Sequence, residues 1–369
     1  MVALNHVGSH AWRRSLDKHW SERARLLYPI RVSALLNIYL LAAFAILGAA
    51  VAGLPARDWW FYALSCFLGG LLGCYPLDKT IRPEHTLKSW GYQVLLGWGL
   101  RAFLFVPLIG LAITIPAKWR WEALGASIGL AIWHAWIVSA GHILILRWMR
   151  ALTPISPELQ AILSECFSKT SVTPRTVGIL RTPLLGAFAA PITQSLVFTE
   201  GLIKHCTPDE IRAICYHELS HLTESRQLKT QRVLSSFVFF PFLFTKPMLD
   251  AWGLWGLVIV GITSVFWQKA GVRLLRRLEV QADQVAVRHE VDPGLYANSL
   301  LKLHILNQIP AVMPRNLVHP HLYDRMLAAG VTPDFPRPQP PKKLNWTTLA
   351  LYAGLILSIY LFYQNFRRW

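Results

Sequence analysis

The stretch TPDEIRAICYHELSHLTE, residues 207–224, constrains this chain more than any other part of it. Thr207 can cap a helix, Pro208 suits the first helical position, where no N–H is required, and Glu210 can reach back as the capping-box partner. The sequence therefore predicts a helix that begins at this point and continues through the histidines that follow.

Two histidines and a glutamate on this helix form an HExxH motif. His217 and His221 stand four residues apart, so both imidazoles project from one face of the helix, about one turn apart. Glu218 lies between them and can hold a water without itself taking a coordination position. The alternative is an amphipathic surface helix that carries two histidines by chance. The arrangement favours a metal-dependent hydrolase in which Glu218 is the general base.

A zinc site of this kind needs a third protein ligand, and the segment LEVQADQVA supplies a candidate. Glu279 follows His221 by 58 residues, and Asp283 lies one helical turn further on. On its own, the ExxxD pattern is weak, because any helix can carry it for solubility. Together with HExxH it predicts one Zn²⁺ per chain, held by His217, His221 and Glu279, with one coordination position left open for a water. Asp283 is expected to accept the free N–H of a ligand histidine.

The composition indicates a membrane protein. Of 369 residues, 53% are hydrophobic and 15% are charged, which is too apolar for an ordinary soluble protein. Five runs have about the length of a membrane span: Val32–Leu54, Trp59–Leu77, Gln93–Ile115, Leu124–Leu146 and Trp346–Tyr363. A sixth apolar run, Val233–Trp267, is divided by prolines and Asp250. We expect it to form a membrane hairpin.

The charge pattern predicts an orientation. Most lysines and arginines fall on the side of the basic tail formed by residues 1–31, so the positive-inside rule places that tail and the metal-binding segments in the cytosol. Topology and anionic lipids account for the net charge of +17. No basic-aromatic binding module is visible, and we expect no nucleic-acid partner.

The segment between the fourth span and the HExxH helix has a mixed pattern. It predicts a helix over Pro157–Lys169 and extended runs over Thr176–Leu180, Ala187–Ala190 and Ser195–Thr199. We expect these runs to form a small sheet, whose role is either purely structural or includes the binding of substrate.

Over Ser171 to Leu327 the sequence resembles the membrane-embedded gluzincin metallopeptidases, the group that contains the HtpX heat-shock protease and the CAAX prenyl proteases. The resemblance lies in GAFAAPITQSLVFTEGLI, HELSH, EVQAD, YANSLLKL and HPHLYDRM. One departure is Gly186, where relatives usually have Asn, so any side-chain role of that Asn is absent here.

The resemblance implies roles for further residues. His319 and Arg325 of HPHLYDRM become candidate catalytic donors to the oxyanion of the reaction. A sheet edge near the metal pairs with the substrate backbone in this group, which makes candidates of Gly186, Ala187, Phe188 and Ala189. The group also inserts a helical pair between HExxH and the third ligand, where this chain has its apolar run.

The expected fold is therefore a mainly α, polytopic membrane protein with a gluzincin-like α+β catalytic domain, which contains the small sheet and the HExxH helix. The expected parts are a basic cytosolic tail (1–31), a membrane domain of four transmembrane helices (32–150), a zinc metallopeptidase domain (151–345) interrupted by the hairpin (233–267), and a C-terminal transmembrane helix (346–369).

The expected function is that of an integral-membrane zinc metalloendopeptidase, which hydrolyses peptide bonds of membrane-associated proteins at the cytosolic face in HtpX-like quality control. A CAAX-type processing peptidase is the alternative within the class. A proteolytically silent zinc-containing scaffold or transporter, with Arg101, His134 and His142 along a path, is the alternative from another class. A bacterial inner membrane is the favoured location and an endoplasmic reticulum-type membrane the other. The sequence does not predict an oligomeric state.

Overall fold

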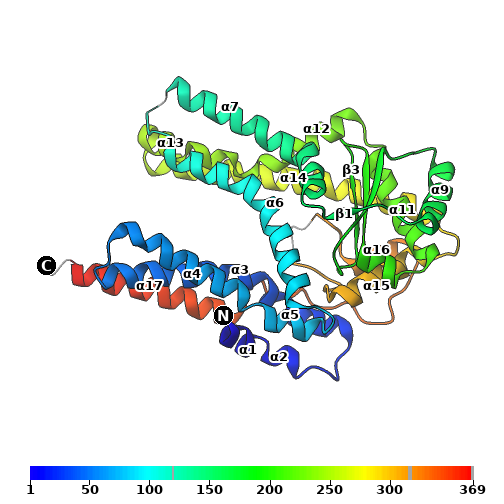
Figure 1. The fold of residues 1–369 in the computed structure, drawn as a ribbon, viewed down its shortest axis with the longest axis horizontal. Helices are drawn as coiled ribbons and strands as arrows, with labels where there is room; N and C mark the ends of the chain where they lie inside the picture. Colours follow the sequence, from blue (N-terminus) through cyan, green and yellow to red (C-terminus); the bar gives the residue numbers. More distant parts are fainter. Residues whose placement is uncertain (119, 315–317, 367–369) are drawn as a thin grey trace. The chain divides into compact units, whose positions relative to one another are not determined.

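The computed structural model describes residues 1–118, 120–314 and 318–366, and these fall into two compact units. The first unit comprises Met1–Gly91, His304–Pro314 and the described residues from 335 onward. The second comprises Tyr92–Leu303 and residues 318–334. Figure 1 labels their helices and strands in chain order.

The first unit is helical throughout its regular structure. Its elements are α1 (Val2–Gly8), α2 (His10–Arg13), α3 (Trp20–Val51), η1 (Ala56–Asp58), α4 (Trp59–Leu72), α5 (Tyr75–Ile81) and α17 (Trp346–Phe366). Helix α3 packs against both α4 and α17 (Figure 1). The expected boundary of a basic tail at residue 31 lies inside α3, which begins eleven residues earlier because the polar segment before the apolar run continues the same helix.

The second unit combines helices with one small sheet. Its elements are α6 (Leu87–Thr114, which begins in the first unit), α7 (Trp121–Trp136), the π-helix η2 (Ile137–Gly141), α8 (His142–Trp148), β1 (Leu152–Thr153), α9 (Pro157–Thr170), β2 (Thr176–Leu180), β3 (Ala187–Ala190), β4 (Ser195–Thr199), α10 (Glu200–His205), α11 (Pro208–Leu222), α12 (Arg226–Ser235), η3 (Ser236–Phe244), α13 (Thr245–Trp252), α14 (Leu254–His289), α15 (Leu295–Asn307) and α16 (Leu322–Ala328).

The sheet has the strand order β1-β2-β4-β3. The three extended runs expected from the sequence are confirmed as β2, β3 and β4, and the two-residue β1 is an addition. Strand β2 runs parallel to β4, while β3 is antiparallel to β4 with Ala187 opposite Phe198. Strand β3 is therefore an edge strand, and among the described residues no further strand pairs with its outer side.

A proline shapes the helix α6, which bends by 45° between Leu87–Arg101 and Phe103–Thr114. Pro107 has no N–H, so it cannot hydrogen-bond to the carbonyl of Phe103 four residues earlier. The indole Nε1 of Trp133 in α7 donates to that carbonyl at 2.9 Å. The neighbouring helix thus satisfies the backbone group that the proline leaves free, as a helix in a membrane requires.

The apolar run after the HExxH helix forms a helical hairpin. Its first arm is α12, η3 and α13, and its second arm is the first half of α14. The chain reverses at Gly253, three residues beyond Asp250, where φ is +56° and favours glycine. Gly256 lets the two arms approach closely, because a Cβ there would lie 2.1 Å from the Met248 carbonyl oxygen.

The helices have the length and composition of membrane spans. Within the described residues, five helical segments are long and apolar enough to cross a membrane, and the bent α6 adds a sixth. They are Trp20–Val51, Trp59–Ile81, Trp121–Trp148, Arg226–Trp252 and Leu254–His289, while Trp346–Tyr360 in α17 is a shorter apolar segment. The chain is thus a multi-pass, mainly α membrane protein with a small α+β part, as the sequence predicted.

Two histidines that the transporter alternative places along a path have packing partners instead. His134 Nε2 lies 2.9 Å from Ser236 Oγ of the hairpin, and its ring packs edge-on against Phe237 and Phe240. His142 Nδ1 hydrogen-bonds to the carbonyl of Ile137 at 3.1 Å. Both contacts agree with packed histidines inside a helical bundle.

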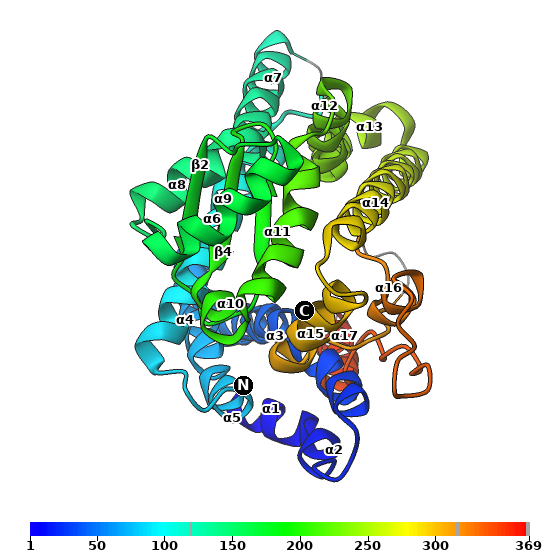
Figure 2. The same cartoon turned by 90° about the vertical axis from the view of Figure 1, so that its right-hand side faces the viewer.

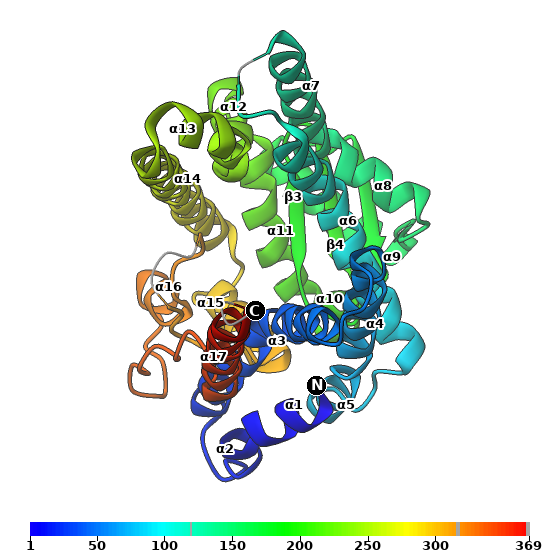
Figure 3. The ribbon, with the colours of Figure 1, turned by 90° about the vertical axis from the view of Figure 1, so that its left-hand side faces the viewer.

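Helix α11 lies at the centre of the second unit. It packs against α14 on one side and against α9 and strand β3 on the other (Figure 2). Figure 3 shows the same helix beside β3 from the opposite direction. The fold thus places the HExxH helix between the edge strand and the helix that carries Glu279.

Gly201 at the start of α10 offers a test of this packing. A Cβ at Gly201 would lie 2.2 Å from the Pro183 carbonyl oxygen, and backbone cannot move aside as a flexible side chain can. We expect Gly201→Ala to cost about 1–3 kcal/mol and to lower the apparent melting temperature by several degrees. Gly178→Ala in β2 is the matched control, since its nearest contact would be an ordinary 3.7 Å. Equal melting temperatures for the two variants would contradict the described packing.

Candidate metal centre

The start of α11 is fixed by the capping box that the sequence predicts. Thr207 Oγ1 accepts a hydrogen bond from the Glu210 N–H at 3.3 Å, and Glu210 Oε2 accepts one from the Thr207 N–H at 2.7 Å. Lys302 of α15 pairs with the same carboxylate at 2.8 Å. These contacts fix, within the first turn, the rotational position of the helix that carries the motif.

The structure brings His217, His221 and Glu279 together. One ligand atom from each residue lies within 4.8 Å of those of the other two, and all three residues are buried. The carboxylate oxygens of Glu279 lie 3.5 Å from Nε2 of His217 and 3.5 Å from Nε2 of His221. Two ligands of a tetrahedral zinc, each about 2.0 Å from it, stand about 3.3 Å apart. The spacing and the donor types therefore fit a zinc ion.

Contacts at the second ring nitrogen, Nδ1, hold the imidazole of His217. Its Nδ1 lies 3.1 Å from Asp283 Oδ1 and 2.8 Å from the hydroxyl of Tyr296, whose O–H donates to Asp283 at 2.6 Å. The two rings also stack, with centroids 5.8 Å apart. These contacts place the proton on Nδ1 and leave Nε2 free to bind a metal.

Arg325 contacts the two residues that hold Nδ1 of His217. Its guanidinium donates to both carboxylate oxygens of Asp283, at 2.8 and 2.6 Å, and to the Tyr296 hydroxyl at 2.8 Å. Only 8% of its side chain is exposed. The resemblance implied that Arg325 donates to the reacting oxygen, and in the structure its guanidinium is paired with the Asp283 carboxylate.

A separate set of contacts holds His221. Its Nδ1 lies 3.1 Å from Glu224 Oε1, and Arg232 of α12 forms an ion pair with the same carboxylate. The Glu224 side chain is 4% exposed. Each histidine of the motif therefore has a carboxylate at Nδ1, and an arginine holds each carboxylate.

The two remaining catalytic candidates differ in exposure. Glu218 is buried, and its carboxylate has no hydrogen-bond partner among the residues that the structure describes. The imidazole of His319 is 67% exposed, with Nδ1 2.8 Å from Glu279 Oε2. His319 therefore marks the side of the group that is open to solvent.

Burial and charge oppose one another at this site. Burial disfavours the charged imidazole of His217, but the carboxylates of Asp283 and Glu279 raise its pKa to about 9. Burial likewise acts to raise the pKa of Glu224, but hydrogen bonds from His221 and Arg232 outweigh it and hold that pKa below its usual range. Burial raises the pKa of Tyr296 well above its ordinary value, so this hydroxyl stays protonated at neutral pH.

The substrate-strand candidates lie at the free edge of the sheet. Ala187, Phe188 and Ala189 belong to β3, which lies next to α11. Gly186 precedes the strand, where its N–H donates to Thr199 Oγ1 at 3.0 Å and its carbonyl accepts from the Thr199 N–H. A backbone contact thus holds this position, and a Cβ would meet no atom within 4 Å.

Three residues of the site were missed from the sequence. Glu224 stands three residues after His221, a spacing that places it on the same side of the helix end and could have identified it. Tyr296 was noticed only within a motif, and Arg232 lies beyond a break in the helix. No spacing rule connects these last two to the histidines, because their positions depend on tertiary packing.

We expect the purified protein to hold one zinc per chain, and His217→Ala, His221→Ala and Glu279→Ala each to lower that occupancy, because each removes one donor of the group. Metal analysis after mild chelation measures the occupancy. His205→Ala serves as the control, since His205 lies at the end of α10 outside the group. Full occupancy in Glu279→Ala would show that the third ligand is a different residue.

Comparison with known proteins agrees with this geometry. Residues 155–332 match peptidase family M48, a family of zinc-dependent metallopeptidases. A protein named Protease HtpX homolog, from Moorella thermoacetica, is 22% identical over 231 residues, which cover 56% of this chain and 77% of that protein. The matched region contains the HExxH helix, the hairpin, Glu279 and the HPHLYDRM segment. Over residues 155–332 this membrane chain is therefore similar to the zinc metallopeptidases of family M48, and to an HtpX protease among them.

Proposed function

We propose that this chain is a zinc metalloendopeptidase that hydrolyses peptide bonds of membrane-associated proteins at the cytosolic face of its membrane. The observation that carries the proposal is the buried group of His217, His221 and Glu279, beside a Glu218 carboxylate without a hydrogen-bond partner among the described residues. A site that used zinc for structure alone would need no such carboxylate. The free base beside an incomplete ligand set therefore favours catalysis.

His217, His221 and Glu279 would hold a zinc ion with three of the four donors that it takes, so one position would remain for a water. Zinc bound there lowers the pKa of a water molecule and polarises a carbonyl group. Glu218 accepts the proton of the attacking water and then delivers it to the departing amine, so one carboxylate acts as base and then as acid. Because the Glu218 carboxylate has no hydrogen-bond partner among the described residues, it remains available for both transfers.

His319 is the donor that we assign to the oxyanion of the reaction. Its imidazole is exposed, lies at the open side of the group and already contacts Glu279. Arg325 acts from the other side, where it holds Asp283 and Tyr296 against His217. This assigns substrate contact to His319 and ligand positioning to Arg325 and Asp283.

Strand β3 supplies a way to bind an extended substrate. A peptide that adds to the open edge of β3 gains main-chain hydrogen bonds with little dependence on its sequence. Ala187, Phe188 and Ala189 lie on that edge beside the HExxH helix, and Gly186 directly precedes them. This mode of binding suits a peptidase that removes damaged or unassembled membrane proteins, the HtpX-like role that we favour over the processing of one defined C-terminal motif.

The cytosolic orientation follows from the distribution of charge. Under the positive-inside rule, the basic flanks of the spans belong with the peptidase domain on the cytosolic side. We keep the domain division expected from the sequence as part of the proposal. Helix α3 extends into the expected tail, and residues 367–369 of the last segment lie outside the described part. A bacterial inner membrane is the location that we favour.

Glu218→Gln tests the mechanism. We expect this variant to keep its zinc and its fold and to lose peptide cleavage by several orders of magnitude, because the base is removed and the ligands remain. Cleavage of a detergent-solubilised membrane substrate measures the loss, with Glu200→Gln, an exposed glutamate of α10, as the control. Substantial turnover by Glu218→Gln would overturn the mechanism, and loss of its zinc would make Glu218 a ligand.

Cysteine labelling in membrane vesicles tests the topology. One zinc must be reached from both flanks of the hairpin, so cysteines introduced at the exposed positions Gln227 and Arg273 should label from the same, cytosolic side. A cysteine at Asp250 should label from the far side if both arms cross the membrane. The cysteines are introduced into a variant in which alanine replaces the partly exposed Cys66, Cys74 and Cys206, while the two buried cysteines are kept. Labelling of the two flanks from opposite faces would exclude the site.

A further inference from the structure

The hairpin provides one of the two arginines that hold the ligand histidines. Arg325, which acts on His217 through Asp283, belongs to α16 at the end of the matched domain. Arg232, which acts on His221 through Glu224, belongs to α12, the first helix of the hairpin. The two histidines thus depend on different parts of the chain.

Glu224 lies in the short joint between the HExxH helix and the hairpin. Helix α11 ends at Leu222, and Ser225 caps α12 by accepting the Leu228 N–H at 3.3 Å. Glu224 Oε1 lies 3.1 Å from His221 Nδ1 and accepts a hydrogen bond from Arg232 Nη2. Arg232 Nε donates to the other carboxylate oxygen, Oε2, at 3.2 Å. A buried carboxylate needs such pairing, because a charge without it is costly to bury.

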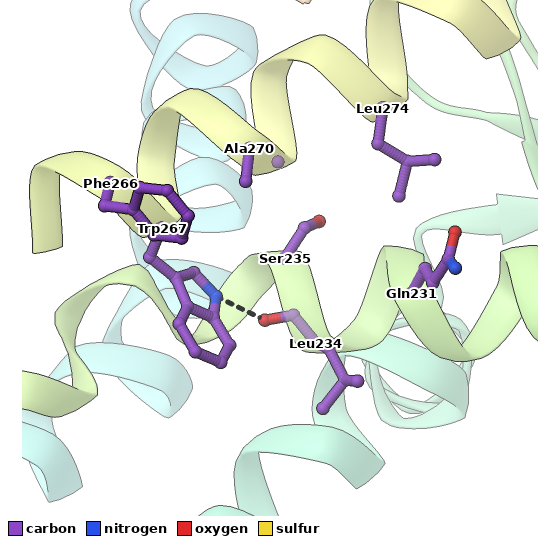
Figure 4. Close-up of a pocket in the computed structure, with 8 residues that line it drawn as sticks. Gln231, Leu234, Ser235, Phe266, Trp267, Ala270 and Leu274 are labelled. Atoms are coloured by element: carbon purple, nitrogen blue, oxygen red, sulfur yellow. Dashed lines mark hydrogen bonds between the residues drawn. The ribbon is translucent and has the colours of Figure 1, made fainter. Parts of the chain in front are cut away.

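Further contacts fix α12 against α14, the helix that carries Glu279. Figure 4 shows the indole of Trp267 donating to the Leu234 carbonyl, at 2.7 Å. One turn further along α14, a Cβ at Gly271 would lie 2.9 Å from Ser235 Cβ, so the two helices are in close contact there. Arg232 lies less than one turn before these contacts, and its backbone position is therefore set by the packing of the hairpin.

We propose that Arg232 is a positioning residue, which holds Glu224 against Nδ1 of His221 and so ties the geometry of the metal site to the packing of the hairpin. The proposal rests on the proposed function in one respect, since it takes His221 to bind zinc through Nε2. A rotation of α12 would withdraw the guanidinium from Glu224 and release the orientation of the imidazole. The metal site is complete only while the hairpin is packed on α14.

The test is the zinc affinity of the full chain in detergent micelles, measured by competition with a chromophoric chelator. Arg232→Gln and Glu224→Gln should each weaken zinc binding by about 10–100-fold, the usual effect of losing a group that orients a metal ligand. Arg226→Gln is the matched control, because Arg226 is an exposed arginine of the same helix with no ion pair among the described residues. It should bind zinc as the unmodified chain does.

A double-mutant cycle separates positioning from a general loss of stability. If Arg232 acts through Glu224, then Arg232→Gln should add little in the Glu224→Gln background. The melting temperature of each metal-free variant shows whether it is folded, and Arg232→Lys should restore part of the affinity if a variant is unstable. Additive losses, or zinc binding by Arg232→Gln equal to that of the control, would overturn the proposal. A failure of the unmodified chain to bind zinc would instead overturn the proposed function.

Discussion

The fold depends on the contact of one carboxylate with two imidazoles that lie far from it in the sequence. Glu279 lies within 3.5 Å of both His217 and His221, although a long apolar run separates it from them. The chain must leave the HExxH helix and return to the same place, and a helical hairpin that reverses at Gly253 achieves this. The helical hairpin is therefore a requirement of the candidate metal site rather than an addition to it.

The same arrangement of a carboxylate and an arginine occurs beside each of the two histidines. A histidine that binds a metal through Nε2 is oriented by the acceptor that Nδ1 meets, and a buried acceptor must itself be paired. Asp283 with Arg325 satisfies the rule for His217, and Glu224 with Arg232 satisfies it for His221. Each imidazole is thus held at Nδ1, and its Nε2 lies 3.5 Å from a carboxylate oxygen of Glu279.

Local sequence rules predicted much of this arrangement. The capping box, the i and i+4 histidines and the three strands depend on neighbouring residues, and the structure has them where the sequence places them. The expected span Val32–Leu54 overlaps α3, a longer helix that begins at Trp20, because a helix does not end where the bilayer does. Tyr296 and Arg232 lay beyond the reach of local rules, since only packing brings them to the histidines. Arg325 was noticed for a part in catalysis, and its ion pair with Asp283 was visible only in three dimensions.

The central claim is that two histidines and a carboxylate hold zinc in this chain. X-ray absorption at the zinc edge of the purified protein tests it directly. We expect a first shell of nitrogen and oxygen at about 2.0–2.2 Å, with the outer scattering of two imidazole rings. A sulfur ligand at about 2.3 Å, or a shell without imidazole, would contradict this assignment.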